Sequence, residues 1–290
     1  MNILVTGSNG QLGSEIKDIA ASYKNFRFFF MDLPALDICN SSELAVFIAK
    51  NKINTVINCA AYTAVDAAEQ NTVIAEQVNG AGVLNLVHAL AKVKGKLIHI
   101  STDYVFDGNG FLPYQESDKT NPIGVYGKTK RNGELAVING NIDGIVIRTS
   151  WLYSSYGTNF VKTMRRLGTE RKEVDVIYDQ LGTPTNASDL AKTCLDILGY
   201  NKEININAKG NVYHYSNEGV ASWYDFAKAI MEFGKIECDV RPIETKDYPS
   251  AAKRPHFSVL NKAKIKNDFE IEIPYWRTSL ARCISKLNQE

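Results

Sequence analysis

Near its N-terminus the chain has the stretch Ile3-Leu4-Val5-Thr6-Gly7-Ser8-Asn9-Gly10-Gln11-Leu12-Gly13, after which apolar residues recur at helical spacing as far as Ile19. This order predicts a short strand, a glycine turn and a helix. Gly7 and Gly10 would let the backbone approach a pyrophosphate, and Gly13 would let the helix pack closely on the strand. The helix N-terminus would offer N–H groups to the anion. We therefore expect the phosphate-binding turn of a dinucleotide fold, although the same glycines would also suit a βα turn that binds nothing.

The pattern of this first unit continues along the chain. Apolar, β-rich runs occur at residues 28–31, 55–58, 96–100, 145–148 and 212–215, and helical patterns separate the earlier ones. Strands that alternate with helices predict an α/β fold with a doubly wound parallel sheet, Rossmann-like. We expect residues 1–153 to form the dinucleotide-binding domain and residues 154–290 to form mainly a smaller C-terminal substrate lobe, with some later segments returning to the sheet. Asn79 interrupts the apolar face of a long helix expected at 73–93, either as a tolerated polar residue or as a hydrogen-bonding group near the site.

Asp32 directly follows the second predicted strand. A dinucleotide fold needs a carboxylate at about this place to bind the ribose hydroxyls of the adenosine. No arginine follows Asp32, so a 2′-phosphate has no obvious partner, and NADH is the first expectation while NADPH stays open. Asp37 is expected either to cap a helix at 42–50 or to lie near the adenine.

Tyr126 and Lys130 stand four residues apart in Val125-Tyr126-Gly127-Lys128-Thr129-Lys130. On a helix they share one face. A neighbouring ammonium favours the phenolate, so we expect Lys130 to bring the pKa of Tyr126 down from about 10. Such a tyrosine can give a proton to a carbonyl oxygen or take one from an alcohol. The alternative is an ordinary exposed pair on a helix.

Composition bounds the other classes of function. The formal net charge of +1 and the interspersed charges argue against a nucleic-acid surface or a polybasic membrane anchor. No apolar run approaches the roughly 20 residues that span a bilayer, and the N-terminus lacks the basic start of a signal peptide. Five scattered cysteines without a Cys-x-x-Cys pair suggest thiols of a reducing compartment, so we expect a cytoplasmic protein.

Several segments of the chain carry a family resemblance together. These are the glycine turn, the acid after the second strand, 101–108, 125–130, 148–153, 159–164 and 182–185, in this order. As a set they resemble the extended short-chain dehydrogenase/reductases that act on nucleotide sugars, and within that branch the dTDP-4-dehydrorhamnose reductase family. The resemblance covers essentially the whole chain.

The resemblance implies a reductase of the C4 keto group of dTDP-4-dehydro-L-rhamnose, with hydride from NADH or NADPH. Tyr126 would protonate the C4 oxygen, Lys130 would hold the nicotinamide ribose and lower the pKa of Tyr126, and Thr102 would hydrogen-bond the carbonyl. Contacts of the sugar pocket would come from Thr63, Val65, Thr102, Asp103, Tyr104 and Trp151. The implied cofactor-binding residues are Gly7, Gly10, Gln11, Leu12, Gly13, Asp32, Asp37, Ile38, Ala61, Tyr62, Thr63, Tyr126 and Lys130.

The substrate also carries a diphosphate, for which Arg254 offers a planar fork of donors; the alternative is an exposed arginine in a surface loop. Some members of the family are described with Mg²⁺ at a dimer contact built from glutamates. Glu15 is in the matching place, but Ser188 stands where the second glutamate is expected. An isolated carboxylate holds Mg²⁺ poorly, so we expect no metal and leave a plain homodimer open.

Two other interpretations remain. One is a reductase or an epimerase of another nucleotide sugar; an epimerase would hold its NAD tightly through purification. The other is a regulatory subunit that keeps the dinucleotide fold without catalysis. The presence of both Tyr126 and Lys130 disfavours the second interpretation.

Overall fold

A six-stranded parallel sheet forms the centre of the molecule in the computed structural model, which describes residues 1–200 and 211–289. Its spatial order is β10 (Asn211–His214), β5 (Asp143–Thr149), β4 (Lys96–Thr102), β3 (Thr55–Asn58), β1 (Asn2–Thr6) and β2 (Arg27–Met31). Every neighbouring pair is parallel, so the predicted doubly wound sheet is confirmed. From β1 the chain goes first to β2 on one side and then to β3 on the other, which makes the carboxyl end of β1 the switch point where such sheets bind ligands.

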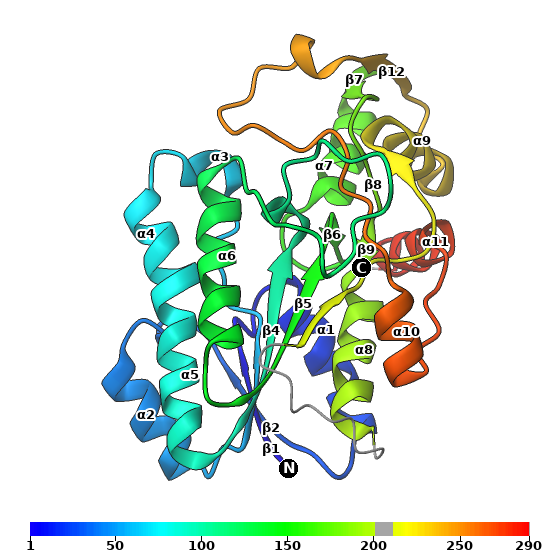
Figure 1. The fold of residues 1–290 in the computed structure, drawn as a ribbon. Coiled ribbons are helices and arrows are strands. Elements are labelled where there is room, and N and C mark those ends of the chain that lie inside the picture. Colours follow the sequence, from blue (N-terminus) through cyan, green and yellow to red (C-terminus); the bar gives the residue numbers. More distant parts are fainter. Residues whose placement is uncertain (201–210, 290) are drawn as a thin grey trace.

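Helices cover both faces of this sheet (Figure 1). On one face α1 (Gln11–Ile19) and α8 (Ala187–Gly199) pack on Ile3 and Val5. On the other face α2 (Ser41–Lys50), α5 (Gly82–Val93) and α6 (Val125–Ile138) pack on Leu4 and Val56. Successive side chains of a strand alternate between faces, and both faces are buried here, which explains why the strands are continuously apolar.

The long helix expected at 73–93 is confirmed as one helical segment with a defect. It consists of α4 (Thr72–Glu76), a π-helical turn at Gln77–Ala81 that contains Asn79, and α5.

The expectation that Asp37 caps the helix at 42–50 is wrong. The side chain of Asn40, and not that of Asp37, accepts the Glu43 N–H at the start of α2, while Asp37 accepts the Cys39 N–H.

A second hydrophobic core lies beyond the carboxyl ends of β4 and β5 (Figure 1). It gathers Val161, Phe226 and Leu280. The elements around it are α7 (Phe160–Glu170), α9 (Trp223–Gly234), α11 (Trp276–Leu287) and the parallel pair β7 (Glu173–Ile177) and β12 (Asp239–Ile243). Short pairs join the two parts, namely β6 (Leu152–Tyr153) with β9 (Thr185–Asn186) and β8 (Leu181–Gly182) with β11 (Ala221–Ser222).

The chain crosses between the two cores more than once. The segments α8, β10 and α10 (Ala263–Phe269) follow residue 153, yet they pack in the core of the large sheet. The one-turn helix α3 (Val65–Ala68) follows β3 at the mouth of the cleft. Over the part of the chain described here, no helix combines the length and the apolarity needed to cross a bilayer.

Candidate functional site

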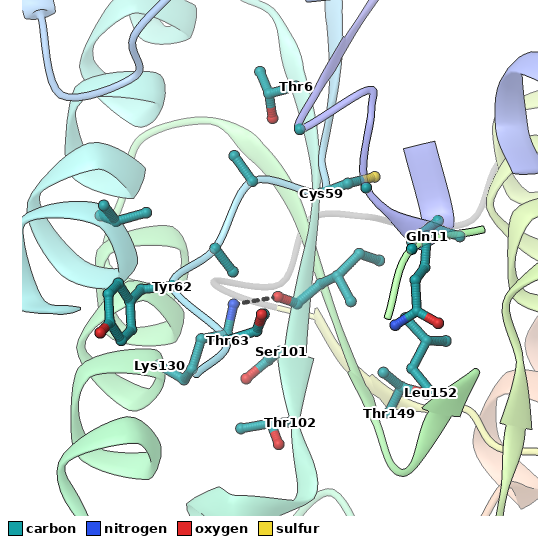
Figure 2. A pocket seen from close by; sticks show the side chains of 18 of the residues that line it. Thr6, Gln11, Cys59, Tyr62, Thr63, Ser101, Thr102, Lys130, Thr149 and Leu152 are labelled. Atoms are coloured by element: carbon teal, nitrogen blue, oxygen red, sulfur yellow. Dashed lines mark hydrogen bonds between the residues drawn. The ribbon is translucent and has the colours of Figure 1, made fainter. Parts of the chain in front are cut away.

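A cavity of about 910 Å³ opens at the carboxyl ends of the central strands. Figure 2 shows Gln11 on one side of the end of β4 and Lys130 on the other. The structure brings nearly all residues predicted for the site into its lining: Gly7, Gly10, Gln11, Leu12, Asp32, Asp37, Ile38, Ala61, Tyr62, Thr63, Val65, Thr102, Asp103, Tyr104, Tyr126, Lys130 and Trp151. Gly13 and Arg254 are not among the lining residues.

The glycine turn has the geometry of a phosphate cradle. Gly7 has a φ of +61°, and a Cβ there would lie 2.7 Å from the backbone nitrogen of Ala60. Gly10 caps α1 without a side-chain hydrogen bond, so backbone N–H groups at the helix start stay available to an anion. A Cβ on Gly13 would lie 2.5 Å from the Gly7 carbonyl oxygen, away from the cavity. Gly13 therefore serves the packing of helix on turn, while the remainder of the cradle fits a dinucleotide pyrophosphate.

The end of β2 places Asp32 beside this turn. Its Oδ2 accepts the Asn9 N–H at 2.9 Å and its Oδ1 accepts the Leu33 N–H at 2.8 Å. Asp37 and Ile38 line the cavity next to it. Among the described lining residues Lys130 is the only lysine or arginine, and Lys130 lies at the end of β4, not beside Asp32 at the end of β2.

The start of α6 carries Tyr126 and Lys130 to the end of β4. The Val125 N–H donates to Glu69 Oε1 at 2.8 Å, which fixes this helix start. A Cβ on Gly127 would lie 2.2 Å from the Tyr104 carbonyl oxygen, so the absence of a side chain lets α6 approach the turn after β4. Thr102 hydrogen-bonds to the Tyr126 side chain, and Lys130 Nζ donates to the Ile100 carbonyl oxygen at 2.6 Å. The Tyr104 ring meets the Tyr126 ring edge to face at 5.6 Å.

The electrostatics of this group differ from the expectation drawn from spacing. Loss of water around the phenol raises the pKa of Tyr126 to about 12, and the charge of Asp103 adds to this, against the Thr102 hydrogen bond. Burial lowers the pKa of Lys130 to about 8, opposed by Glu134 and then Cys59. The expected lowering of the Tyr126 pKa by Lys130 is wrong for this structure, because desolvation dominates and the ammonium is bonded to Ile100. Tyr126 is consequently a neutral proton donor at neutral pH.

Asp103 and Trp151 approach the cavity from neighbouring strand ends. Burial raises the pKa of Asp103 to about 6, against hydrogen bonds from Ser258 and Thr102. Trp151 has a φ of +49° and stacks on Trp223, with ring centroids 3.6 Å apart. A non-glycine residue in the left-handed region persists only where its surroundings hold it, and such residues gather at ligand sites. Trp151 is therefore both a packed tryptophan and a wall of the cavity.

Arg254 does not line the cavity itself, although its charge acts on the cavity residue Tyr104. Its guanidinium makes a two-pronged ion pair with Asp66 of α3, with Nη2 to Oδ2 at 2.6 Å and Nη1 to Oδ1 at 3.2 Å. That hydrogen bond is the main reason why the pKa of Asp66 lies below its usual value. Val65, the residue before Asp66, does line the cavity, so the ion pair stands near its rim.

The lobe contributes residues that sequence reasoning missed. Gly157, Thr158 and Asn159 line the cavity beside Gln11 of the glycine turn. Asn159 caps α7 and its Nδ2 donates to Gln11 Oε1 at 3.0 Å, which ties the lobe to the glycine turn. An asparagine before a helical pattern signals a cap, but only the tertiary structure shows that this cap faces a second helix start.

Comparison with known proteins identifies the family. The family model described as RmlD substrate binding domain matches residues 1–289. The dTDP-4-dehydrorhamnose reductase of Aggregatibacter actinomycetemcomitans is 38% identical over 284 residues, 96% of either chain. The solved dTDP-4-dehydrorhamnose reductase from Clostridium acetobutylicum superposes with a TM-score of 0.93 at 40% identity, over 99% of this chain and 100% of that one. The dTDP-4-dehydrorhamnose reductase from Bacillus anthracis, solved in complex with NADP, superposes with a TM-score of 0.91 at 35% identity, over 98% of this chain and 99% of that one. The chain thus belongs to the dTDP-4-dehydrorhamnose reductase family.

Proposed function

We propose that this chain reduces the C4 keto group of dTDP-4-dehydro-L-rhamnose (dTDP-6-deoxy-L-lyxo-4-hexulose) to dTDP-L-rhamnose with NADH or NADPH. The observation that carries the proposal is the meeting of Thr102, Tyr126 and Lys130 at one strand end, in the same cavity as the glycine turn. A donor pair beside a dinucleotide cradle suits a carbonyl reduction. The names of the similar enzymes give the class of substrate.

The reaction needs a proton on the C4 oxygen and a fixed carbonyl. When bound, the nicotinamide would supply the hydride to C4. Tyr126, neutral at pH 7 because its pKa is raised to about 12, donates the phenolic proton to the C4 oxygen. Thr102, whose Oγ1 also lies 3.0 Å from Asp103 Oδ1, donates a hydrogen bond that orients the carbonyl. The Lys130 ammonium then stabilises the phenolate left behind.

Substrate contacts in this proposal follow the cavity walls. The Trp151 indole offers a flat apolar face to the deoxysugar, and Asp103 accepts from its hydroxyls. Val65 and Tyr104 border the same space. Arg254 binds the diphosphate, for which it leaves Asp66, since a two-pronged fork suits either carboxylate or phosphate.

Cofactor contacts come from the opposite walls. The glycine turn would hold the pyrophosphate, and Asp32 would bind the adenosine ribose. The remaining lining residues proposed for the cofactor would hold the adenine and the nicotinamide; they are Asp37, Ile38, Ala61, Tyr62, Thr63, Tyr126 and Lys130.

The proposal divides the chain by role. Residues 1–153 hold the dinucleotide, and most of 154–290 binds the nucleotide sugar. Supporting this division, the second core lies within the lobe that supplies Asn159, and Trp223, which packs against this core, stacks on Trp151. We place the enzyme in the cytoplasm because all five cysteines keep their thiols. A homodimer remains part of the proposal, without a metal at Glu15, which is buried against Ser154 and Lys286 of the same chain.

The test is Tyr126→Phe, assayed by NADH oxidation with the 4-keto sugar made enzymatically and by identification of the product. We expect turnover to fall by about 10²-fold or more while NADH affinity stays nearly intact, within the usual range for loss of a general acid. Tyr156→Phe is the matched control, because its phenol bonds Asp18 outside the cavity. Unchanged turnover in Tyr126→Phe would remove Tyr126 from the mechanism, and an epimerised product without net NADH oxidation would replace the reductase by an epimerase.

A further inference from the structure

One turn beyond Lys130 on α6 lies a fully buried carboxylate, Glu134, which lines no part of the cavity. Its Oε1 accepts the Ser101 hydroxyl at 2.6 Å and Arg148 Nε at 2.8 Å. Its Oε2 accepts Arg148 Nη2 at 2.9 Å and Arg131 Nη1 at 2.6 Å. Four donors therefore hold this side chain in one orientation.

The main partner of Glu134 is equally enclosed. Arg148 of β5 is 2% exposed, and its guanidinium lies 5.1 Å from the Phe106 ring centre. Its Nη1 faces His214 Nε2 of β10 at 3.3 Å, and His214 Nδ1 lies 3.0 Å from the Tyr114 carbonyl oxygen. Burial lowers the pKa of His214 to about 3, so the imidazole is neutral. Its Nδ1–H donates a hydrogen bond to the Tyr114 carbonyl oxygen, and its Nε2 accepts one from Arg148 Nη1.

Stability alone is a weak explanation for such a pair. The desolvation of two buried charges often equals or exceeds the attraction between them, and apolar residues of similar volume can serve as well. The contacts of this pair instead point at the site. Ser101 directly precedes Thr102 at the end of β4, and Arg148 precedes the segment that leads to Trp151.

The charges around Lys130 single out Glu134. From the end of β3 comes Cys59, whose thiol has a pKa raised well above its usual value by burial. From β4 comes His99, whose pKa burial lowers far below its usual value, so it is neutral. From α6 come Tyr126 and Glu134. Burial raises the pKa of Glu134, but the bonds from Arg148, Ser101 and Arg131 outweigh it and the net pKa is lowered. Of the described groups that act on Lys130, Glu134 is thus the one that is anionic at neutral pH.

We propose that Glu134 is a positioning residue for the reductase reaction: clamped by Arg148, it fixes the end of β4 through Ser101, and its charge keeps Lys130 an ammonium. The inference rests on the proposed function for its catalytic meaning. Its electrostatic part concerns the binding of NADH alone, because Lys130 is the proposed contact of the nicotinamide ribose. The two parts can therefore fail separately.

The experiment measures NADH affinity by fluorescence titration, and kcat/KM with the 4-keto sugar, across pH 6 to 10 in roughly half-unit steps, since kcat/KM reports groups of the free enzyme. In the wild type both should decline as pH rises through about 8, where Lys130 loses its proton. Glu134→Gln keeps the size of the side chain and removes its charge. We expect the decline at high pH, the basic limb of each pH profile, to move down by about one pH unit in Glu134→Gln. This is the scale for the loss of one adjacent opposite charge.

Two variants separate charge from structure. Glu134→Asp keeps the charge and should restore the wild-type position of the limb even where turnover or the melting temperature is lower. Arg131→Gln removes one bond to Glu134 and leaves its charge, so the limb should not move. If Glu134→Gln does not fold, the double variant Glu134→Gln/Arg148→Gln removes both buried charges and should still show the downward shift.

A basic limb that stays at the wild-type pH in Glu134→Gln, or in the double variant, overturns the proposal and leaves Glu134 a structural residue. Wild-type protein that binds NADH but does not oxidise it with the 4-keto sugar would instead refute the proposed function. The NADH titrations would then still decide whether Glu134 governs Lys130.

Discussion

We propose that Asp32 distinguishes NADH from NADPH in this cavity. Its carboxylate is already oriented by the Asn9 and Leu33 N–H groups, and of the described residues that line the cavity only Lys130, at the end of β4, is a lysine or arginine. An oriented carboxylate binds ribose hydroxyls well and repels a 2′-phosphate. We therefore expect the enzyme to prefer NADH, although the similar Bacillus anthracis enzyme was solved with NADP.

Replacing Asp32 by Ala should weaken the binding of NADH by roughly 10- to 100-fold, which is the range for loss of hydrogen bonds to a charged group. The affinity for NADPH should change much less. Fluorescence titration with both dinucleotides measures the two dissociation constants. Asp175→Ala, on β7 of the lobe, removes a carboxylate without touching the cavity and serves as the control. Equal losses for NADH and NADPH would discard the ribose assignment.

For single residues, the sequence predicts which side chains lie together in the cavity but not the direction in which their pKa values shift. Residue type and spacing placed Tyr126 and Lys130 on one face, and both line the cavity. The direction of the Tyr126 pKa shift was missed, because desolvation depends on residues brought together only by the fold. The Asp66 partner of Arg254 was invisible for the same reason, since the two residues are 188 positions apart.

The π turn between α4 and α5 carries Asn79, whose side chain bonds to two other elements. Asn79 in that turn accepts the Tyr62 N–H at 2.9 Å and donates to the Tyr62 carbonyl oxygen and to Thr129 Oγ1, both at 3.1 Å. Turns of this type are rare and concentrate at functional sites. This one joins the cavity-lining loop after β3 to the helix that carries Tyr126.

Asn79→Leu should test the role of this element. The substitution leaves polar groups of Tyr62 without partners, and each buried unsatisfied group costs about 1–3 kcal/mol of unfolding free energy. We expect a lower denaturation midpoint together with weaker NADH binding. Asn132→Leu, which removes an exposed amide bonded to Glu76, should change neither. Full NADH affinity in Asn79→Leu would separate the π turn from the site.

Apolar runs and glycine positions were enough to predict the strands and the long helix. They did not predict the π turn, because the shift in backbone pairing depends on the partners of Asn79 in other elements. They also did not single out Asn40 over Asp37 as the cap of α2, since both residue types suit that position. They also gave no sign that residue 114 pairs with the late segment, where the Tyr114 N–H donates to the Val259 carbonyl oxygen.

Across the whole molecule the Arg254–Asp66 pair bridges the two halves at the rim of the cavity. If Arg254 leaves Asp66 to bind the diphosphate, Arg254→Gln should raise KM for the nucleotide sugar by about tenfold or more and leave NADH affinity unchanged. Steady-state kinetics give KM, and Arg241→Gln, which breaks the exposed ion pairs with Glu173 and Asp175 in the lobe, is the matched control.

Asp66→Asn separates the two roles of Arg254. It breaks the same ion pair but leaves the guanidinium able to bind phosphate, so KM should not rise. An equal rise of KM in Asp66→Asn and Arg254→Gln would mean that the pair only holds the halves together.

The overall architecture followed from the alternation of strands and helices, and a late strand near residue 212 was expected. Which neighbour it would take was not, because a parallel pairing leaves no mark in the paired sequences. The structure places β10 at the edge, beside β5, with α8 beneath it on the face that also carries α1.

That arrangement limits how such enzymes can exchange parts. A recombination event with a single crossover near residue 153 would bring in a foreign edge strand and a foreign covering helix along with the new specificity half. A chimaera that imports only the sugar-recognising surface must therefore retain the native α8 and β10, which means joining the parental genes at several points.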